Sequence, residues 1–185
     1  TPISVVIPLA ERIAQIAKHP LYVIDIASIK KQIVERFEKL STSKVEFIAS
    51  HPMTGKEKSG FKHSLASLFV DASWVIVPHG NNTQHGLDLA KSLIQFTGAK
   101  SKQMDAEQHD RQTALISHLP ALISKILLKF AEETDPASLE IAGPGFKSVT
   151  RLAHANPLMH AEIFESNRRN IEQLLQSFIK EVVKL

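Results

Sequence analysis

Three short apolar runs rich in β-branched residues constrain what the first half of this chain can fold into. They are Leu21–Ile26, Val45–Ala49 and Ser73–Pro78. A continuous apolar run bounded by polar residues is typical of a strand covered on both faces of a sheet. A fourth short strand is expected at about Ala99–Met104. Because helical patterns alternate with these runs, the sequence predicts α/β units with a parallel sheet.

The helical patterns precede or follow the predicted strands. The first covers 10–18 and is ended by His19-Pro20, because the residue before a proline is disfavoured in a helix. The second runs from Ser28, a good N-cap residue, to about Leu40. The third covers 82–96 and is closed by Gly98.

The pattern changes near residue 104. Asp105 is expected to cap a long amphipathic helix, and Asp135-Pro136 and Asn156-Pro157 each begin a further helix. We therefore predict two domains. The first, 1–104, is a partial Rossmann-like α/β domain with a parallel sheet, and the second, 105–185, is all-α.

Composition excludes several classes of protein. The net charge of +3 comes from 22 basic and 19 acidic residues that are interspersed, which argues against a nucleic-acid-binding stripe. No apolar run approaches the roughly 18 residues that span a bilayer, so no membrane partner is expected. The absence of cysteine excludes disulfides and thiolate chemistry and suits a cytoplasmic protein.

His51 is the candidate catalytic residue. It follows the predicted strand Val45–Ala49 and opens a polar loop with two glycines, and α/β proteins place ligands at such strand ends. An imidazole there can do acid–base work near neutral pH, although a plain surface histidine before a proline remains open. The histidines lack the spacing of a zinc-binding helix, and no Gly-x-Ser-x-Gly or Gly-x-Gly-x-x-Gly turn occurs.

The segment His51–Gly60 strongly resembles the signature of the prephenate/arogenate dehydrogenase family of tyrosine biosynthesis. Other segments of the chain resemble further motifs of this family and occur in the expected order. They are Asp25–Lys30, His109-Asp110 followed by Ser117–Pro120, Gly145–Ala153, and Asn167 in the final helix. The resemblance covers nearly the whole chain. The family's nucleotide-binding domain also has a glycine-rich N-terminal half, which this sequence does not contain.

The resemblance implies a Rossmann-like domain followed by a helical dimerisation domain similar to the C-terminal domain of 6-phosphogluconate dehydrogenase. It implies an oxidoreductase that uses NAD or NADP to convert prephenate to 4-hydroxyphenylpyruvate by oxidative decarboxylation, in a homodimer, with tyrosine as a candidate inhibitor. Because the glycine-rich turn is missing, we expect this chain by itself to be inactive.

The resemblance also implies roles for individual residues. It implies no metal site. His51 would be the base and Ser28 its hydrogen-bonding partner, and the cofactor would contact Ser28 and Pro2. The expected substrate-binding residues are Ser117, Arg151, Glu57, Gly55, Lys56 and His118. A guanidinium such as that of Arg151 is the natural partner for a substrate with carboxylates.

Three positions depart from the family pattern. Ala121 replaces a histidine, Ser148 an aspartate and His160 a tryptophan. These changes leave the choice between prephenate and arogenate open, and with it tyrosine inhibition. The alternatives are therefore an arogenate dehydrogenase and a non-catalytic dimeric module that binds aromatic acids.

Overall fold

The computed structural model describes residues 2–40, 42, 44–55 and 60–184. The chain divides into two compact units, Thr1–Asp110 and Arg111–Leu185. Each unit has its own secondary structure and is described by itself below.

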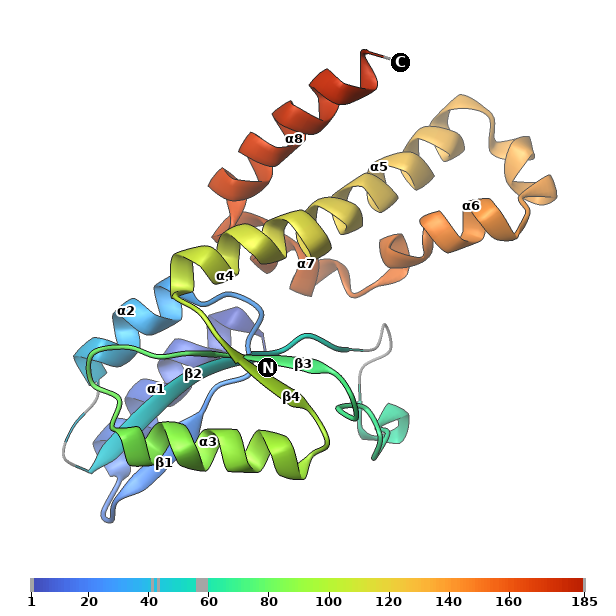
Figure 1. Cartoon of the computed structure of the whole chain (residues 1–185). Helices are drawn as coiled ribbons and strands as arrows, with labels where there is room; N and C mark the ends of the chain where they lie inside the picture. The colour runs from blue at the N-terminus through green and yellow to red at the C-terminus, as the bar shows by residue number, and fades with distance from the viewer. Residues whose placement is uncertain (1, 41, 43, 56–59, 185) are drawn as a thin grey trace. The chain divides into compact units, whose positions relative to one another are not determined.

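The first unit is built on a four-stranded sheet (Figure 1). Its strands lie in the order of the chain and are β1 (Leu21–Ile24), β2 (Val45–Pro52), β3 (Ser73–Val77) and β4 (Lys100–Gln103). All the strands that the apolar runs predict are therefore present. The pairs β1–β2 and β3–β4 are parallel, whereas β2 and β3 are antiparallel.

The antiparallel pairing of β2 and β3 corrects the parallel arrangement expected from the sequence. Parallel neighbours need a crossover, usually an α-helix, that carries the chain back to the starting edge. Between Pro52 and Ser73 the described residues form only one short helical element, the 3-10 turn η1 (Phe61–His63). Without a crossover helix, the chain returns alongside β2 in the opposite direction.

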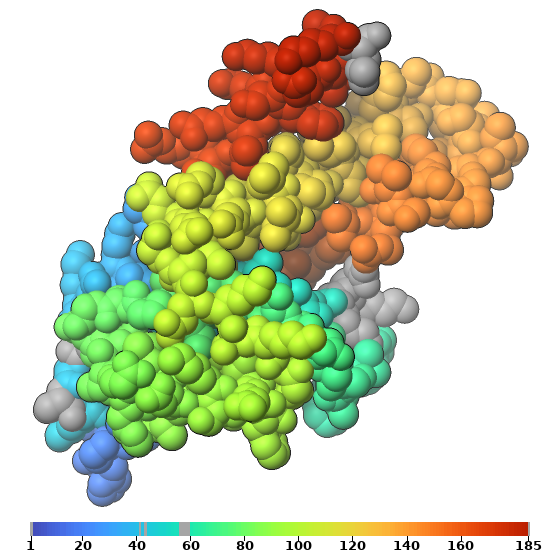
Figure 2. All heavy atoms as spheres, in the orientation of Figure 1, coloured from blue at the N-terminus to red at the C-terminus, as the bar shows by residue number. Residues whose placement is uncertain are grey.

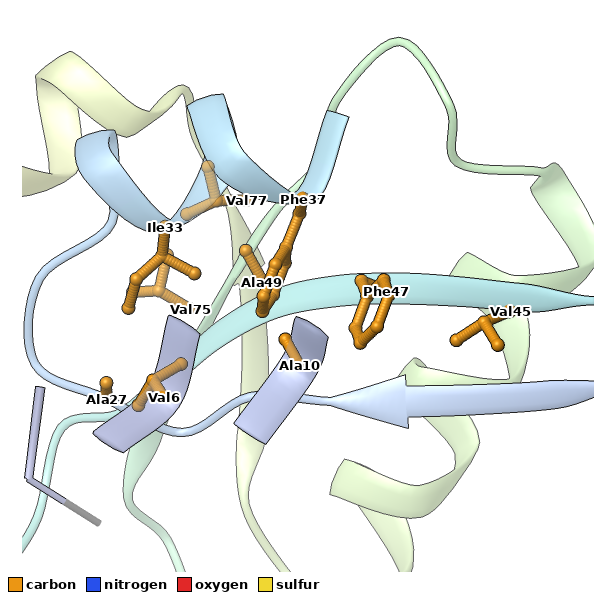
Figure 3. Close-up of a cluster of buried hydrophobic side chains, with 10 residues drawn as sticks. All are labelled: Val6, Ala10, Ala27, Ile33, Phe37, Val45, Phe47, Ala49, Val75 and Val77. Carbon is orange, nitrogen blue, oxygen red and sulfur yellow. The ribbon is translucent and has the colours of Figure 1, made fainter. Parts of the chain in front are cut away.

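Helices cover both faces of the sheet. Alternate residues of β2, Val45, Phe47 and Ala49, pack against α1 (Ile3–Ile16) and α2 (Lys31–Leu40). Figure 3 shows this cluster, in which the Phe37 and Phe47 rings stack with centroids 4.9 Å apart. On the opposite face, Ile48, Trp74 and Ile76 pack against α3 (Gln84–Phe96). Strands β2 and β3 are largely buried on both faces, which explains why their residues are mostly apolar.

Two helices begin at other residues than the sequence suggests. Helix α1 starts at Ile3, so Pro8 lies inside it, and its buried residues Val6 and Ala10 are one turn apart on the face toward the sheet. Helix α2 starts at Lys31 rather than near Ser28. Ser28 is therefore not its N-cap; a carboxylate from outside the helix takes that place, as described below.

The second unit is helical, apart from its turns. A helix that starts in the first unit, α4 (Ala106–Thr113), continues through a π-helical turn, η2 (Ala114–His118), into α5 (Leu119–Thr134). Figure 2 shows the side chains of the C-terminal α8 segment in red on one side of the yellow α5 segment, with orange side chains on the other side. The remaining elements are η3 (Pro136–Ile141), α6 (Pro144–Val149), η4 (Arg151–His154), α7 (Pro157–Ser166) and α8 (Arg168–Val182).

Two of the predicted N-caps, Asp105 and Asn156, are confirmed, whereas Asp135 makes no side-chain cap hydrogen bond and Pro136 begins only the 3-10 turn η3. The Gln108 N–H donates to Asp105 Oδ1 at 2.7 Å, and the Leu158 N–H donates to Asn156 Oδ1 at 2.9 Å. Gly98 follows α3 with φ of 83°, the left-handed conformation that favours glycine after a helix. The last helical stretch, which Asn156-Pro157 begins as predicted, is broken at Asn167 between α7 and α8.

The stretch Ala106–Thr134 is long and apolar enough to cross a membrane by length and composition, in the part of the chain that the structure describes. The core helix of a globular protein passes the same test. Several of its apolar side chains are exposed, among them Leu115, Ile116, Ile126 and Phe130. An exposed apolar stripe of this kind is typical of a helix that packs against a partner.

Candidate functional site

His51 lies on β2, in the ladder of the sheet rather than in the loop that follows. It is paired with Val75 of β3, and the next residue, Pro52, is paired with Trp74. The side chain is half-buried. The pairing with β3 therefore fixes the backbone of this histidine.

A second histidine, from the first turn of α4, contacts His51. The Nδ1 atom of His51 lies 2.9 Å from Nε2 of His109, and the two ring planes make an angle of 65°. The other ring nitrogen of His109, Nδ1, lies 2.8 Å from Oδ1 of Asp110. His109 is fully buried and Asp110 is 3% exposed. The three side chains therefore form a line of hydrogen bonds that leads from the half-buried His51 inward.

The Asp110 carboxylate is anchored at the start of α2. Its Oδ1 accepts the backbone N–H of Lys30 at 2.8 Å, and its Oδ2 accepts that of Lys31 at 2.9 Å. These are N–H groups that the start of a helix leaves without helical partners, and the helix dipole favours a negative charge there. Asp110 thus performs the capping role that the sequence assigns to Ser28.

A buried ion pair holds the loop between β1 and α2. The Lys30 ammonium pairs with the Asp25 carboxylate, and both side chains are almost completely buried. Asp25 also accepts the Ala27 N–H at 2.8 Å, and its carbonyl accepts the Ser50 hydroxyl at 2.6 Å. Burial lowers the pKa of Lys30, and the Asp25 carboxylate opposes that shift. This network ties the loop to the end of β2, next to His51.

The hydrogen-bond roles along the line follow from its inner end. Asp110 is an acceptor, since the oxygens of a carboxylate accept hydrogen bonds and two backbone N–H groups already donate to it. The His109 Nδ1 must then carry the proton, which leaves the lone pair of its Nε2 to accept from His51 Nδ1. In neutral His51 the lone pair is therefore on Nε2. A histidine in this state can accept a proton at Nε2.

The other predicted site residues of the first unit lie in the loop between β1 and α2, after the end of β2 and at the N-terminus. Ser28 is half-buried in the loop that the Asp25–Lys30 pair holds. Gly55 is exposed, three residues after the end of β2, and Pro2 directly precedes α1. Lys56 and Glu57 lie outside the described residues.

Three predicted substrate-binding residues belong to the second unit. Ser117 and His118 lie in the π-helical turn η2, an irregularity that often marks a functional position in a helix. His118 is buried, and its Nδ1 lies 3.0 Å from the Asn167 side-chain nitrogen. Ser117 and Arg151 are exposed, and Arg151 begins η4.

The departures from the family pattern also lie in the second unit. Ala121 is buried on α5, and Ser148 is exposed on α6. His160 is buried, and its ring stacks on that of Phe164 with centroids 5.4 Å apart. Burial, and then the positive charge of Lys125, lower the pKa of His160. Its Nδ1 has no hydrogen-bond partner among the residues that the structure describes.

His109 and Asp110 are the site residues that sequence reasoning missed. The family resemblance includes them as a pair but implies no role for them. His109 lies 58 residues after His51, so no local pattern connects the two. A histidine followed by an aspartate in the first turn of a helix is a signal that could have drawn attention to them. Among the described residues there is no group of three or more side chains suited to hold a metal ion.

Comparison with known protein families gives two matches that together cover the chain. Residues 1–103 match the prephenate dehydrogenase nucleotide-binding domain, and residues 105–185 match the prephenate dehydrogenase dimerization domain. The prephenate dehydrogenase of Bacillus subtilis is 28% identical over 100% of this chain and 51% of its own length. That of Lactococcus lactis is 34% identical over 97% of this chain and 50% of its own length.

Solved structures agree with this likeness. The prephenate dehydrogenase of Aquifex aeolicus in complex with hydroxyphenyl propionate and NAD⁺ has a TM-score of 0.90, with 28% identity over 100% of this chain and 65% of that one. The arogenate dehydrogenase of Synechocystis has a TM-score of 0.81, with 26% identity over 100% of this chain and 67% of that one. The chain spans about half the length of the curated relatives that it matches.

Proposed function

Because the chain belongs to the prephenate dehydrogenase family, we propose that the protein containing it oxidises and decarboxylates prephenate to 4-hydroxyphenylpyruvate in tyrosine biosynthesis. The observation that supports this most directly is the line His51–His109–Asp110, which leaves His51 able to accept a proton at Nε2. Two of the similar proteins are named prephenate dehydrogenase, and a similar structure contains NAD⁺ and hydroxyphenyl propionate.

The first unit suits part of a dinucleotide site. Strands β1 and β2 are parallel, so their carboxyl ends open at the same edge of the sheet, where α/β proteins bind nucleotides. The loop with Ser28 leaves one of these ends and His51 lies near the other. Ser28 and Pro2 are the residues that would contact NAD or NADP. When bound, the nicotinamide supplies the hydride acceptor.

His51 would act on the hydroxyl of the substrate ring. Its Nε2 accepts the hydroxyl proton as the carbinol carbon loses hydride, so that the C–O bond becomes a carbonyl. Loss of carbon dioxide then makes the ring aromatic and drives the reaction forward. The tasks of the chain are therefore to take one proton and to hold the ring in position.

The substrate-binding roles that the family resemblance implies fall on residues of each unit. Arg151 offers a planar guanidinium that can bind a carboxylate through two parallel hydrogen bonds. Ser117 and His118 would contact the substrate from η2. Gly55, Lys56 and Glu57 would contribute from the loop after β2, where Glu57 would gate the pocket.

The protein would work as a homodimer in the cytoplasm. The match of the second unit to a dimerization domain supports the homodimer, and so does the exposed apolar side of the helices in this unit. Beyond the exposed residues of α5 given above, α8 exposes Phe178, Ile179 and Val182. The similar biosynthetic dehydrogenases support the cytoplasmic location.

Arogenate is the second candidate substrate, because a similar structure is that of an arogenate dehydrogenase. Ala121 and His160 stand at two positions where the family pattern has larger ring-bearing side chains, so they bear on ring recognition and on inhibition by tyrosine. A non-catalytic module that binds aromatic acids is the alternative from another class, and it predicts binding without turnover.

The test uses the intact gene product. Prephenate or arogenate is supplied with NAD⁺ or NADP⁺, and reduced nicotinamide is followed by its near-ultraviolet absorbance. We expect turnover with one of the four combinations, with release of carbon dioxide. Calorimetric binding of prephenate or tyrosine without any turnover would instead establish the binding module.

A further inference from the structure

We infer that His109 and Asp110 are positioning residues for His51: they hold its imidazole in the state with the proton on Nδ1 and take up part of the positive charge when Nε2 is protonated. The role in catalysis rests on the function proposed above. The protonation pattern of the three side chains in the resting protein does not, because it is inferred from the hydrogen bonds of Asp110 and His109.

The geometry supports an ordered line rather than an accidental contact. Each link is within hydrogen-bond distance, at 2.9 Å between the imidazoles and 2.8 Å between His109 and Asp110. The inner end is fixed by the backbone N–H groups of Lys30 and Lys31. Since a carboxylate only accepts hydrogen bonds, the direction of the bonds is set from Asp110 outward.

During the reaction the line would stabilise the positive charge that forms on His51. When His51 Nε2 takes the hydroxyl proton, the ring becomes an imidazolium, and its Nδ1–H still donates to His109 Nε2. The positive charge then faces a neutral acceptor that is itself polarised by a buried carboxylate. In a buried setting such preoriented groups stabilise a charge more strongly than water-exposed groups do.

The rival interpretation is that His109 is a buried histidine that only stabilises the fold. Both interpretations predict a loss of stability when His109 is replaced. Only the positioning role predicts a change in the protonation of His51 and a loss of kcat in protein that is still folded. The two are therefore separated by a spectroscopic measurement together with kinetics.

The spectroscopic test records the ¹⁵N signals of the histidine rings in the protein without substrate. In the native protein we expect the neutral His51 to carry its proton on Nδ1 and His109 also on Nδ1. In His109→Phe, Nδ1 of His51 loses its acceptor, so the ring is free to take the other tautomer and its signals shift. A native His51 with its proton on Nε2, or an unchanged His51 in folded His109→Phe, overturns the inference.

The kinetic test compares three substitutions in the intact gene product. His109→Phe removes the acceptor, and we expect kcat to fall by about 10²-fold or more with little change in KM. His109→Gln keeps an oxygen that can accept from His51, so kcat should recover to within about tenfold of the native value. Asp110→Asn removes the charge, and we expect an intermediate loss of kcat.

The matched control is Glu107→Gln. It makes the same carboxylate-to-amide change in the same helical turn as Asp110, but on an exposed side chain whose ion pair with Lys31 spans 3.7 Å. Its kcat should equal that of the native protein. If folded His109→Phe and Asp110→Asn keep kcat within about threefold of that control, the positioning role is wrong. If the native protein turns over none of the substrates, the proposed function fails, whereas the ¹⁵N pattern still decides the protonation line.

Discussion

The Asn167 side-chain nitrogen lies 3.0 Å from Nδ1 of His118, and it joins the break between α7 and α8 to the π-helical turn η2. An amide nitrogen can only donate, so Nδ1 of His118 accepts and the proton of the neutral ring is on Nε2. Both residues are buried. One asparagine therefore sets the protonation of a predicted substrate-binding residue.

Replacing Asn167 should weaken the second unit. In Asn167→Ala the buried Nδ1 of His118 loses this donor, which should lower the free energy of unfolding by about 1–3 kcal/mol. Asn170→Ala is the control, because Asn170 is only half-buried and donates to Asn167 rather than to the histidine. Urea unfolding of both variants measures the difference. Equal losses would mean that the contact with His118 contributes little.

Removing the Lys30 ammonium should be far more costly than removing that of its neighbour. Lys30→Met leaves the Asp25 carboxylate buried without its cation, which should cost about 3–5 kcal/mol. Lys31→Met makes the same change on an exposed side chain and should cost less than about 0.5 kcal/mol. Adding Asp25→Asn to Lys30→Met should restore part of the loss, as measured by chemical denaturation. No restoration would show that the two charges are not coupled.

His160 should make the folded chain less stable at acidic pH than at neutral pH. Its pKa is lowered in the folded chain, so below about pH 6.5 the unfolded chain binds a proton that the folded chain does not. Stability from this source is fully present at neutral pH and decreases as the pH falls from about 6.5 toward the lowered pKa.

The variant His160→Phe isolates this contribution. It keeps a ring to stack on Phe164 and removes the buried Nδ1 that has no partner among the described residues. The difference in unfolding free energy between pH 7.5 and 5.5 should become smaller than in the native chain. His154→Phe, at an exposed histidine of the same unit, should leave that difference unchanged. A native pH dependence in both variants would contradict the assignment.

Gly86 should be intolerant of a methyl group only while Glu46 is present. A Cβ at Gly86 would lie 2.2 Å from Glu46 Oε1, and this carboxylate accepts both the backbone N–H and the hydroxyl of Thr83, the N-cap of α3. Gly86→Ala should therefore destabilise the chain by about 1–3 kcal/mol.

In the background Glu46→Ala, the same glycine substitution should be neutral or stabilising by up to about 1 kcal/mol, because alanine favours a helix over glycine. Thermal unfolding of the four chains gives the comparison. The same loss in both backgrounds would assign the cost to the helix itself rather than to the carboxylate.

His51→Asn tests the proposed base directly. Asparagine can still form a hydrogen bond but does not accept a proton near neutral pH, so kcat should fall by about 10²–10⁴-fold with a modest change in substrate affinity. The measurement is steady-state turnover of the intact gene product beside calorimetric binding of the substrate. A variant with native kcat would remove His51 from the chemistry.

The parts of the fold that depend on neighbouring residues could be predicted from the sequence. Strands β1, β2 and β3 coincide with the three apolar runs, and the caps Asp105 and Asn156 act within three residues of the groups that they bind. Such signals are local, because they depend on the period of burial and on the free N–H groups at a helix start.

What could not be predicted depends on residues far apart in the chain. Ser28 was a reasonable N-cap, but a carboxylate 80 residues after Lys30 occupies the start of α2 instead. The antiparallel pairing of β2 and β3 depends on the connection between them, where the described residues form no crossover helix, rather than on either strand. The contact between His51 and His109 forms only in the folded chain, because the two residues are 58 positions apart. No local pattern encodes these encounters.

The position of His51 inside the β2 ladder has a consequence for how this protein can change over time. Because strand pairing orders its backbone during folding, substrate capture need not supply that order again. The polar segment that follows Pro52 can then vary in composition while the imidazole of the proposed base stays in place. New ring substituents could be accommodated by altering that segment alone, so that selectivity and reactivity evolve separately.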